Sequence, residues 1–254
     1  MSELENKSCY LCGSSEVLLL KEGTRDNPDI NLLRCETCGL QQLDSFDHIS
    51  EEHYVESNMG YPSKCVLDDD RRVERLKSIF LQKNVLEFGS GLGGFCQKIK
   101  KYVNNITAVD LDHQAAETYE KNNIDFLRDT TGLKEGFYDY IVMFHVLEHL
   151  KDPISDLNNL KKFLKSGGSF YIEVPNAKDA LLEIYRSKEF LNFNTYADHL
   201  FTFTSENLKT IAKKCGLRVD SIEQVQRYPL SNHMLWVQEG KGLGHVRYDF
   251  LNDE

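Results

Sequence analysis

The chain lacks any apolar stretch long enough to cross a bilayer. None of its runs approaches the roughly 20 consecutive apolar residues that a transmembrane helix needs. Residues 1–7 are polar and include no hydrophobic signal region. From these two absences we expect a cytoplasmic protein without a membrane partner.

An excess of positive charge is missing as well. The chain holds 30 Lys and Arg against 40 Asp and Glu, a formal net charge of −10. Proteins that bind nucleic acid over a broad surface usually gather basic side chains on one face. The balance therefore argues against a nucleic-acid partner, although a local basic pocket stays open. Internal repeats and low-complexity segments are also absent, and 254 residues with 41% hydrophobic content suffice for a full α/β core and one small accessory module.

Seven cysteines in a chain without a signal region are not expected to form a disulfide framework. Four of them form two Cys-x-x-Cys-Gly motifs, Cys9–Gly13 and Cys35–Gly39, with 22 residues between Cys12 and Cys35. This spacing is typical of a tetrahedral zinc ribbon, in which four thiolates leave no open position and the metal is structural. The predicted zinc ligands are Cys9, Cys12, Cys35 and Cys38. The remaining Cys65, Cys96 and Cys215 are expected to be small buried residues.

A glycine-rich segment follows an apolar run near the middle of the chain. The run ends at Glu87 and is typical of a buried parallel strand, and the glycines that follow permit a sharp turn into a helix whose free N–H groups face a ligand. A second apolar strand ends at Asp110, 23 residues after Glu87, where an acid accepts hydrogen bonds from two ribose hydroxyls. This spacing indicates the adenosine-binding half of a nucleotide-cofactor fold.

The glycine positions alone fit two cofactors. Gly89, Gly91 and Gly94 match the Gly-x-Gly-x-x-Gly of a dinucleotide-binding turn. Glu87, however, starts the pattern Glu-x-Gly-x-Gly-x-Gly, which resembles motif I of class I S-adenosylmethionine-dependent methyltransferases. Residues 138–153 and 165–176 look like the fourth and fifth strands of the same fold, which favours a methyltransferase over a dehydrogenase. The resemblance spans residues 84 to 238.

This resemblance implies an α/β fold, namely a Rossmann-like, doubly wound, seven-stranded methyltransferase sheet with a small N-terminal zinc ribbon. Strands are expected near 85–88, 106–110, 124–127, 139–144 and 168–174, with two more, 217–226 and 233–238, beside the fifth. Helices are expected over 64–81, from Asp152-Pro153 to Gly167-Gly168, and from Thr204 to Gly216. The predicted domains are a zinc-ribbon module (1–45), a connector and helix (46–83) and the methyltransferase domain (84–254).

The resemblance also implies the contacts to S-adenosylmethionine. Motif I lies against the cofactor, Asp110 with the adjacent Leu111 takes the ribose side, and Asp129 is positioned like the acid that accepts from the adenine amino group. His145, after the fourth strand, should lie near the methionine end, with Glu148 and His149 one turn further along in a structural or cofactor-facing role. The predicted cofactor-binding residues are Glu87, Gly89, Gly91, Gly93, Asp110, Leu111, Asp129 and His145.

Residues 176–203 exceed an ordinary strand-to-helix connection, so an acceptor pocket is expected there. Within them, Tyr196–Phe203 resembles the Tyr-x-Glu-His-x-x-Tyr-Phe element of zinc-containing sugar C-methyltransferases, in which the Glu-His pair is tied to base catalysis. By position His199 is the predicted general base and Asp198 its carboxylate neighbour. The chain departs from the element with Asp for Glu and Phe for Tyr, and the alternative is a pair that caps local structure.

Further acceptor contacts are expected outside this insertion. Tyr54 and Tyr61 match tyrosine-rich positions ahead of the core in the same family and are predicted to line the acceptor pocket, with ordinary packing as the alternative. Residues 226–233 and Lys241–His245 concentrate bases, aromatic residues and glycines, which suit a phosphorylated substrate. An edge strand followed by a tail explains the same composition.

Taken together, these features resemble the sugar methyltransferases of antibiotic and surface-polysaccharide pathways. We predict methylation of a small-molecule acceptor, a nucleotide-linked sugar or related glycan precursor, on oxygen or carbon. The related C-methyltransferases carry a further C-terminal domain, and this chain ends at Glu254, so O-methylation is predicted at least as strongly. The alternatives are a zinc-ribbon RNA methyltransferase and a non-catalytic S-adenosylmethionine-binding or assembly module. The sequence carries no signal for the oligomeric state.

Overall fold

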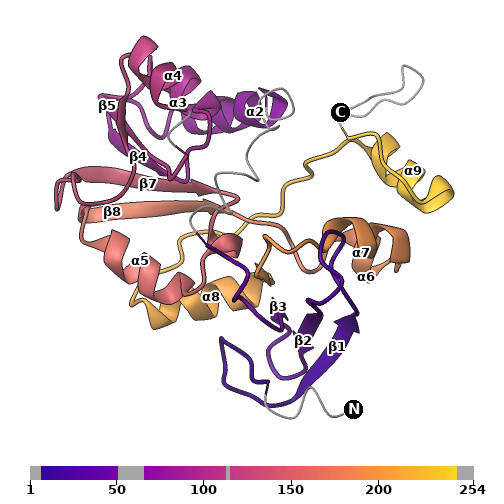
Figure 1. Ribbon diagram of the computed structural model, residues 1–254. Coiled ribbons are helices and arrows are strands. Elements are labelled where there is room, and N and C mark those ends of the chain that lie inside the picture. The colour runs from indigo at the N-terminus through magenta and orange to yellow at the C-terminus, as the bar shows by residue number, and fades with distance from the viewer. Residues whose placement is uncertain (1–6, 51–65, 113–114, 245–254) are drawn as a thin grey trace. The chain divides into compact units, whose positions relative to one another are not determined.

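The computed structural model describes residues 7–50, 66–112 and 115–244 (Figure 1). Contacts divide the chain into two compact units, one from residues 47–174 and the other from residues 1–46 together with 175–254. These units are defined by contacts and do not test which segments fold independently. The domain boundaries expected from the sequence therefore stay a prediction. Tyr54, Tyr61, Cys65 and His245 lie outside the described residues. Among the described helices, none combines the length and apolar character needed to span a bilayer.

The unit from residues 47–174 contains a five-stranded parallel sheet (Figure 1). Its strands, in spatial order, are β6 (Asp125–Leu127), β5 (Asn105–Val109), β4 (Asn84–Phe88), β7 (Tyr138–Phe144) and β8 (Leu164–Glu173). Within this sheet the first strand along the chain is the central β4. The next two strands, β5 and β6, lie on one side of it, and β7 and β8 lie on the other. In open α/β sheets such a reversal of strand order marks the ligand-binding crevice, at the carboxyl ends of the strands.

The helices of this unit are α2 (Val66–Leu76), α3 (Gly94–Ile99), α4 (Ala116–Lys121), the 3-10 helix η2 (Leu147–His149) and α5 (Pro153–Lys161). Residues of α2, α3 and α4 share one apolar core with strands β4, β5 and β7. Val85 of β4, Phe95 of α3 and Tyr119 of α4 are fully or almost fully buried in that core. A strand covered on both faces needs an apolar run rather than alternation, which explains why β4 is apolar up to Glu87.

The helix predicted to begin at Asp152-Pro153 starts there, but it is shorter than the sequence predicts. Asp152 caps α5 by accepting from Ser155 N at 3.1 Å, and Pro153 opens the helix. The helix ends at Lys161, and Gly167 and Gly168 lie inside β8, not at a helix end. They lie where the register with β7 shifts, and a Cβ on Gly168 would come within 3.1 Å of three backbone oxygens. These glycines therefore serve a strand irregularity.

Two sequence-predicted strands are wrong. Residues 217–226 have no regular secondary structure, and 233–238 lie inside helix α9 (Leu230–Glu239). Leu230, Met234 and Val237 recur at helical spacing, and Pro229 and Gly240 mark the two ends of the helix. The expected seven-stranded sheet thus has five strands among the described residues. The helix expected over 64–81 is also shorter, since α2 ends at Leu76.

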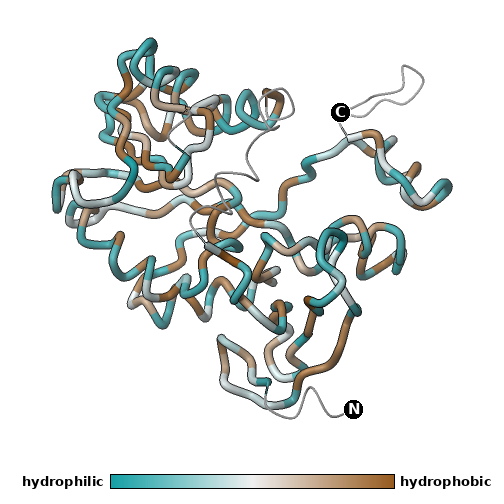
Figure 2. The backbone as a smooth tube through the Cα atoms, in the orientation of Figure 1, coloured by the Kyte–Doolittle hydropathy of each residue, from teal (hydrophilic) through white to brown (hydrophobic). Residues whose placement is uncertain are grey.

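The unit from residues 1–46 and 175–254 contains a four-stranded sheet, β1 (Val17–Lys21), β2 (Leu32–Cys35), β3 (Gln41–Leu43) and β9 (Phe201–Thr202). All three strand pairs are antiparallel, and β9 joins through Gln41 and Gln42. The long insertion therefore completes the sheet of the cysteine-containing segment. Figure 2 shows the hydrophobic character of β1, the edge strand, in which Leu18 and Leu19 are about two-fifths exposed.

The remaining helices of this unit are α6 (Ala180–Glu183), α7 (Lys188–Asn194), α8 (Ser205–Lys214) and α9. Helix α8 is confirmed as the sequence predicts. Thr204 and Asn207 form a reciprocal capping box at its start, and Gly216, with φ +65°, follows its end. Cys96 and Cys215 are buried thiols, as expected from their single spacing.

Candidate functional site

The glycine-rich turn between β4 and α3 has a left-handed backbone. Gly89, Gly91 and Gly93 have φ values of +73°, +51° and +75°, a region that other residues rarely adopt. A Cβ on Gly89 would lie 2.3 Å from Val146 Cγ2, and one on Gly93 would lie 2.6 Å from Tyr119 Cε1. A Cβ on Gly91, in contrast, would meet no atom within 4 Å. The turn is thus closely packed at two glycines and open at the middle one, where a ligand has room.

Tyr119 of α4 fastens this turn from within the core. Its hydroxyl donates to Ser90 Oγ at 2.7 Å and lies 3.0 Å from Gly91 O, and its ring stacks on Phe126 of β6 at 4.7 Å between centroids. Burial raises the pKa of the phenol, so Tyr119 remains a hydrogen-bond donor at neutral pH. Sequence reasoning missed this residue, because nothing in the local pattern of α4 points to the turn.

Asp110 lies beside the turn at the end of β5, as the sequence predicts. Its Oδ2 accepts from Gly91 N at 2.6 Å and its Oδ1 accepts from Asp112 N at 2.9 Å. Burial raises the pKa of Asp110, while these two bonds act in the opposite direction. A carboxylate has about four acceptor positions, so Asp110 retains capacity for the hydroxyls of a ribose. The adjacent Leu111 is half-buried.

Glu87, the first residue of the motif, is buried at the end of β4. It is 4% exposed, and its Oε2 accepts from the Cys96 thiol at 2.8 Å. Burial raises the pKa of Glu87 to about 8, although the bond from Cys96 acts in the opposite direction. A carboxyl group held partly protonated near neutral pH responds strongly to a cation placed beside it.

Asp129 differs from the other predicted cofactor residues because it is exposed. Its Oδ1 accepts from Thr131 N at 2.8 Å and from the Thr131 hydroxyl, and these bonds lower its pKa. The carboxylate thus closes a local turn after β6. Its contact with an adenine amino group stays a prediction.

His145 directly follows β7 and belongs to a network of polar and charged side chains. Its Nδ1 lies 3.2 Å from Glu148 Oε1 and its Nε2 lies 3.4 Å from Glu173 Oε1. Glu173, the last residue of β8, also binds Arg72 Nη2 at 2.7 Å and Arg71 Nη2 at 2.8 Å. Burial acts to raise the pKa of Glu173, but the hydrogen bonds from His145 and the arginines outweigh it, so the pKa is well below its usual range.

Arg71 has hydrogen-bonding capacity that the described part of the chain does not use. Its Nε and Nη1 atoms are buried and have no hydrogen-bond partner there. Leaving a buried donor unpaired costs about 1–3 kcal/mol, and more for a charged group. Such donors suit an anionic group of a ligand. Arg71, Arg72 and Glu173 were not identified from the sequence, since their pairing joins α2 to the end of β8.

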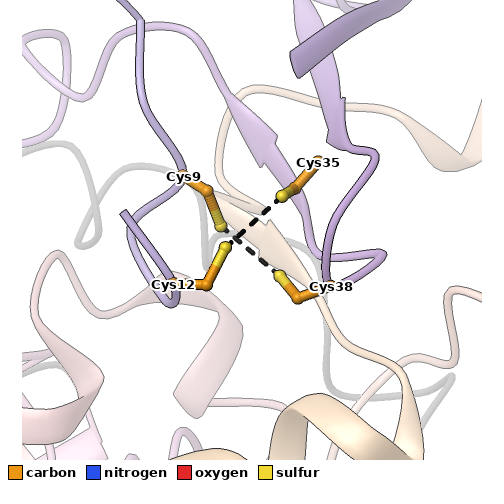
Figure 3. Close-up of side chains that lie close together, drawn as sticks. All are labelled: Cys9, Cys12, Cys35 and Cys38. Carbon is orange, nitrogen blue, oxygen red and sulfur yellow. Dashed lines mark hydrogen bonds between the residues drawn. The ribbon is translucent and has the colours of Figure 1, made fainter. Parts of the chain in front are cut away.

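The four cysteines of the other unit converge (Figure 3). Cys9 Sγ lies 3.5 Å from Cys38 Sγ, Cys12 Sγ lies 3.5 Å from Cys35 Sγ, and all four sulfur atoms lie within 4.8 Å of one another. Sulfur atoms bound tetrahedrally at about 2.3 Å from zinc are about 3.8 Å apart. The spacing of these thiols therefore fits a zinc ion.

The backbone of the two cysteine motifs has the same geometry. Gly13 N donates to Cys9 O at 2.8 Å, and Gly39 N donates to Cys35 O at 2.9 Å. Gly13 and Gly39 have nearly equal positive φ values, +73° and +74°. Both motifs thus form the same tight turn, which explains the glycine that follows each pair of cysteines.

His199 lies in a turn that leads into β9, in the same unit as the cysteines. It is 8% exposed, and its Nε2 is hydrogen-bonded to the hydroxyl of Tyr196, with the two ring centroids 4.0 Å apart. Asp198 is half-buried, and its pairing with His199 stays a prediction. Tyr196 is a functional candidate to which sequence reasoning gave no role, although it opens the element that carries His199.

The basic residues near the C-terminus have local partners. Arg227 lies 5.2 Å over the ring of Tyr228, and Lys241 Nζ lies 3.5 Å from Glu239. Asn232 Oδ1 accepts from Leu243 N and Gly244 N at 2.9 Å each, which ties this segment to α9. A phosphate contact at this segment stays a prediction.

Comparison with known proteins identifies the fold that carries this site. Residues 63–222 match a family model described as a methyltransferase domain. The chain is similar to a ubiquinone biosynthesis O-methyltransferase of Hydrogenovibrio crunogenus, 26% identical over 217 residues that cover 76% of this chain and 88% of that protein. It is also similar to the protein of the same name from Nitrosomonas europaea, 22% identical over 164 residues that cover 59% and 70%.

Solved structures show the same fold. A SAM-dependent methyltransferase from Archaeoglobus fulgidus is 19% identical, with a TM-score of 0.52 over 72% of this chain and 80% of that one. A SAM-dependent methyltransferase from Aquifex aeolicus is 19% identical, with a TM-score of 0.52 over 70% and 93%.

We expect Glu87 to make stability depend on pH. Because its folded pKa of about 8 exceeds the unfolded value, the folded state binds the proton more tightly, and this stabilisation is lost as the pH rises from about 4.5 to about 8. The loss is on the order of 4 kcal/mol for the cofactor-free protein. Urea unfolding of wild type and Glu87→Gln at pH 5 and pH 8 measures it. Wild type should lose stability relative to the variant, and parallel pH curves would contradict the assignment.

Proposed function

Because this chain belongs to the class I S-adenosylmethionine-dependent methyltransferases, we propose that it methylates a small-molecule acceptor, with a hydroxyl or carbon of a nucleotide-linked or surface-polysaccharide sugar as the leading target. The observation that carries this proposal is the buried His199, hydrogen-bonded to Tyr196 in a unit that also gathers four cysteines. This combination supports a member of the zinc-containing sugar methyltransferases. The net charge of −10 argues against a nucleic-acid acceptor, which would favour a basic surface.

The residues of the parallel-sheet unit fit the cofactor. The open backbone at Gly91 admits it, Asp110 retains acceptor capacity for the ribose, and the two unpaired donors of Arg71 suit the carboxylate of the methionine end. Leu111 would contact the ribose side together with Asp110, Asp129 the adenine side, and Glu87 and His145 the methionine side. When bound, S-adenosylmethionine supplies an electrophilic methyl group on a sulfonium. The protein then has to align the acceptor and exclude water.

Proton removal from the acceptor is assigned to His199. A hydroxyl becomes a stronger nucleophile when a base accepts its proton, and an imidazole is suited to this at neutral pH. The hydroxyl of Tyr196 holds the ring of His199 through Nε2 and fixes its orientation. Asp198 is proposed as the carboxylate that supports the basicity of His199, and Tyr54 and Tyr61 as residues that line the acceptor pocket.

The relatives favour a second acceptor class. The two relatives named as ubiquinone biosynthesis O-methyltransferases point to a hydroxyl on a precursor of ubiquinone. The proposed base serves such an acceptor equally well, because it removes a hydroxyl proton in both cases. The chemical nature of the methylated product distinguishes the two.

The four-cysteine cluster is proposed to hold a structural zinc ion. Four thiolates close the coordination sphere, so the ion would support the fold of its unit and take no part in methyl transfer.

Methyl transfer should place label in a small-molecule fraction. Purified protein is incubated with methyl-labelled S-adenosylmethionine and a cell extract depleted of its own cofactor, and the products are separated into small-molecule, RNA and protein fractions. We expect a labelled sugar, identified by mass. A labelled aromatic product would support the second acceptor class, whereas label confined to RNA would overturn both.

In the same assay His199→Ala should lower transfer by about 10²–10⁴-fold, because general bases contribute on this scale. Binding of S-adenosylmethionine should be unchanged. Lys209→Ala, at an exposed position of α8 in the same unit, is the control and should keep wild-type transfer. Transfer by His199→Ala at the wild-type rate would reject the base.

Zinc content provides a separate test. Native mass spectrometry should find one zinc ion per chain, and Cys38→Ser should lose it and lower the thermal stability, since metal-binding energy contributes to folding. Cys215→Ser, at a buried thiol outside the cluster, should keep the ion. Metal-free protein of unchanged stability would contradict the assignment.

A further inference from the structure

The loop between β1 and β2 binds the turn that carries His199, within one compact unit. Arg25 N donates to Thr195 O at 2.8 Å, and Asp26 Oδ1 accepts from Ala197 N at 2.9 Å. These two contacts hold the backbone immediately before and immediately after Tyr196. The Ala197 N–H lies between α7 and β9, outside regular secondary structure, and the carboxylate of Asp26 accepts its hydrogen bond.

The other end of the turn is also held. Leu43 N donates to Leu200 O at 2.9 Å, directly before β9 pairs with β3. Ala197, His199 and Leu200 are each less than a tenth exposed. The backbone from residue 195 to residue 200 is therefore held on both sides by the N-terminal segment, and α7 adds a bond from Thr195 N to Leu191 O at 3.1 Å.

Asp26 is oriented before it reaches the turn. The Thr24 hydroxyl donates to Asp26 Oδ1 at 2.9 Å, and Thr24 N donates to Asn27 O at 2.8 Å. Asn27 N in turn donates to Thr24 Oγ1 at 2.9 Å. These bonds form a small closed ring around Thr24, so the carboxylate is presented in one orientation. Bonds from N–H groups to a carboxylate are about twice as strong as neutral ones.

Arg25 adds a contact with the ring of Tyr196 itself. Its guanidinium lies 5.0 Å from the centroid of Tyr196 and 5.0 Å from that of Phe193, and its Nη1 donates to Phe193 O at 3.2 Å. A cation over an aromatic ring is attracted by the negative face of the ring, so this contact favours one position of the Tyr196 side chain. The ring that Arg25 contacts is the one whose hydroxyl holds His199 Nε2.

We propose that Asp26 and Arg25 are positioning residues that set the orientation of the Tyr196–His199 pair for proton removal. The loop from β1 to β2 thereby couples the cysteine-containing segment to catalysis. Its contribution to catalysis rests on the proposed role of His199, whereas its effect on the geometry of the turn does not. The two parts are tested by different measurements.

The geometry is tested without an acceptor. Amide hydrogen exchange over residues 195–200 and modification of His199 by diethyl pyrocarbonate are measured by peptide mass spectrometry on the full chain. Asp26→Ala should raise both rates by about tenfold, in line with loss of a bond of about 1.4 kcal/mol. Asp26→Asn, which keeps an oxygen acceptor, should stay near wild type. Asp29→Ala is the control, because its side chain makes no hydrogen bond or ion pair in the described part of the chain.

Catalysis is tested with labelled methyl transfer into the small-molecule fraction of a cell extract. Asp26→Ala should lower kcat about tenfold and leave the KM for S-adenosylmethionine within twofold of wild type, and Asp26→Asn should restore kcat. Arg25→Gln, which keeps the backbone N–H, should raise His199 modification and lower kcat severalfold, and it serves if Asp26→Ala does not fold. Wild-type exchange and modification in both variants would overturn the positioning role. Wild-type transfer by His199→Ala would instead overturn the proposed base.

Discussion

The left-handed glycine turn at the end of β4 is the constraint on which the rest of the parallel-sheet unit depends. Its backbone has to stay accessible at Gly91 while the turn is held in a conformation that other residues disfavour. Two side chains fix this conformation: the Tyr119 hydroxyl donates to Ser90 Oγ, and the Asp110 carboxylate accepts from Gly91 N. The order of the strands serves the same site. It makes β5, β4 and β7 neighbours, so that their carboxyl ends lie together at one edge of the sheet.

The second requirement is to keep polar and charged groups at that edge of the sheet, where each of them is at least partly buried. The structure meets it by joining His145, Arg71 and Arg72 on the single carboxylate of Glu173. Isolated buried charges are very costly, and the hydrogen bonds from His145 and the two arginines hold the pKa of Glu173 well below its usual range, so its carboxylate stays ionised. Burial also raises the pKa of Glu87 to about 8, although its carboxylate accepts a hydrogen bond from the Cys96 thiol.

Features that depend on local chemistry were predictable from the sequence. The glycine motif, Asp110 and the paired Cys-x-x-Cys-Gly segments each need particular residues at a fixed spacing, and the structure brings each set together. Five strands of the parallel sheet and helix α8 follow from apolar runs and caps. The predicted strand 233–238 failed because the apolar residues around 230–237 recur at every third or fourth position, a spacing that fits α9, whereas residues 217–226 have no regular secondary structure.

Features that depend on long-range pairing were not predictable. The pairing of β3 with β9 joins segments at opposite ends of the chain, and two-residue strands leave no periodic signal. Tyr196, Arg71 and Tyr119 gain their roles from partners on other elements or turns, so their own sequence neighbourhoods look ordinary. Asp198 was predicted as the carboxylate neighbour of His199 from the resemblance, and Tyr196, three residues before His199, is a hydrogen-bond partner that sequence reasoning did not name.

The most direct test of this account is calorimetric titration of S-adenosylmethionine into the purified full chain and into Asp110→Ala. The account predicts one site per chain in the wild type and at least about a tenfold weaker affinity in the variant, because the ribose loses its carboxylate and Gly91 N loses its acceptor. An unchanged affinity in the variant, or no binding by the wild type, would contradict the claim that the glycine turn and Asp110 form the cofactor site.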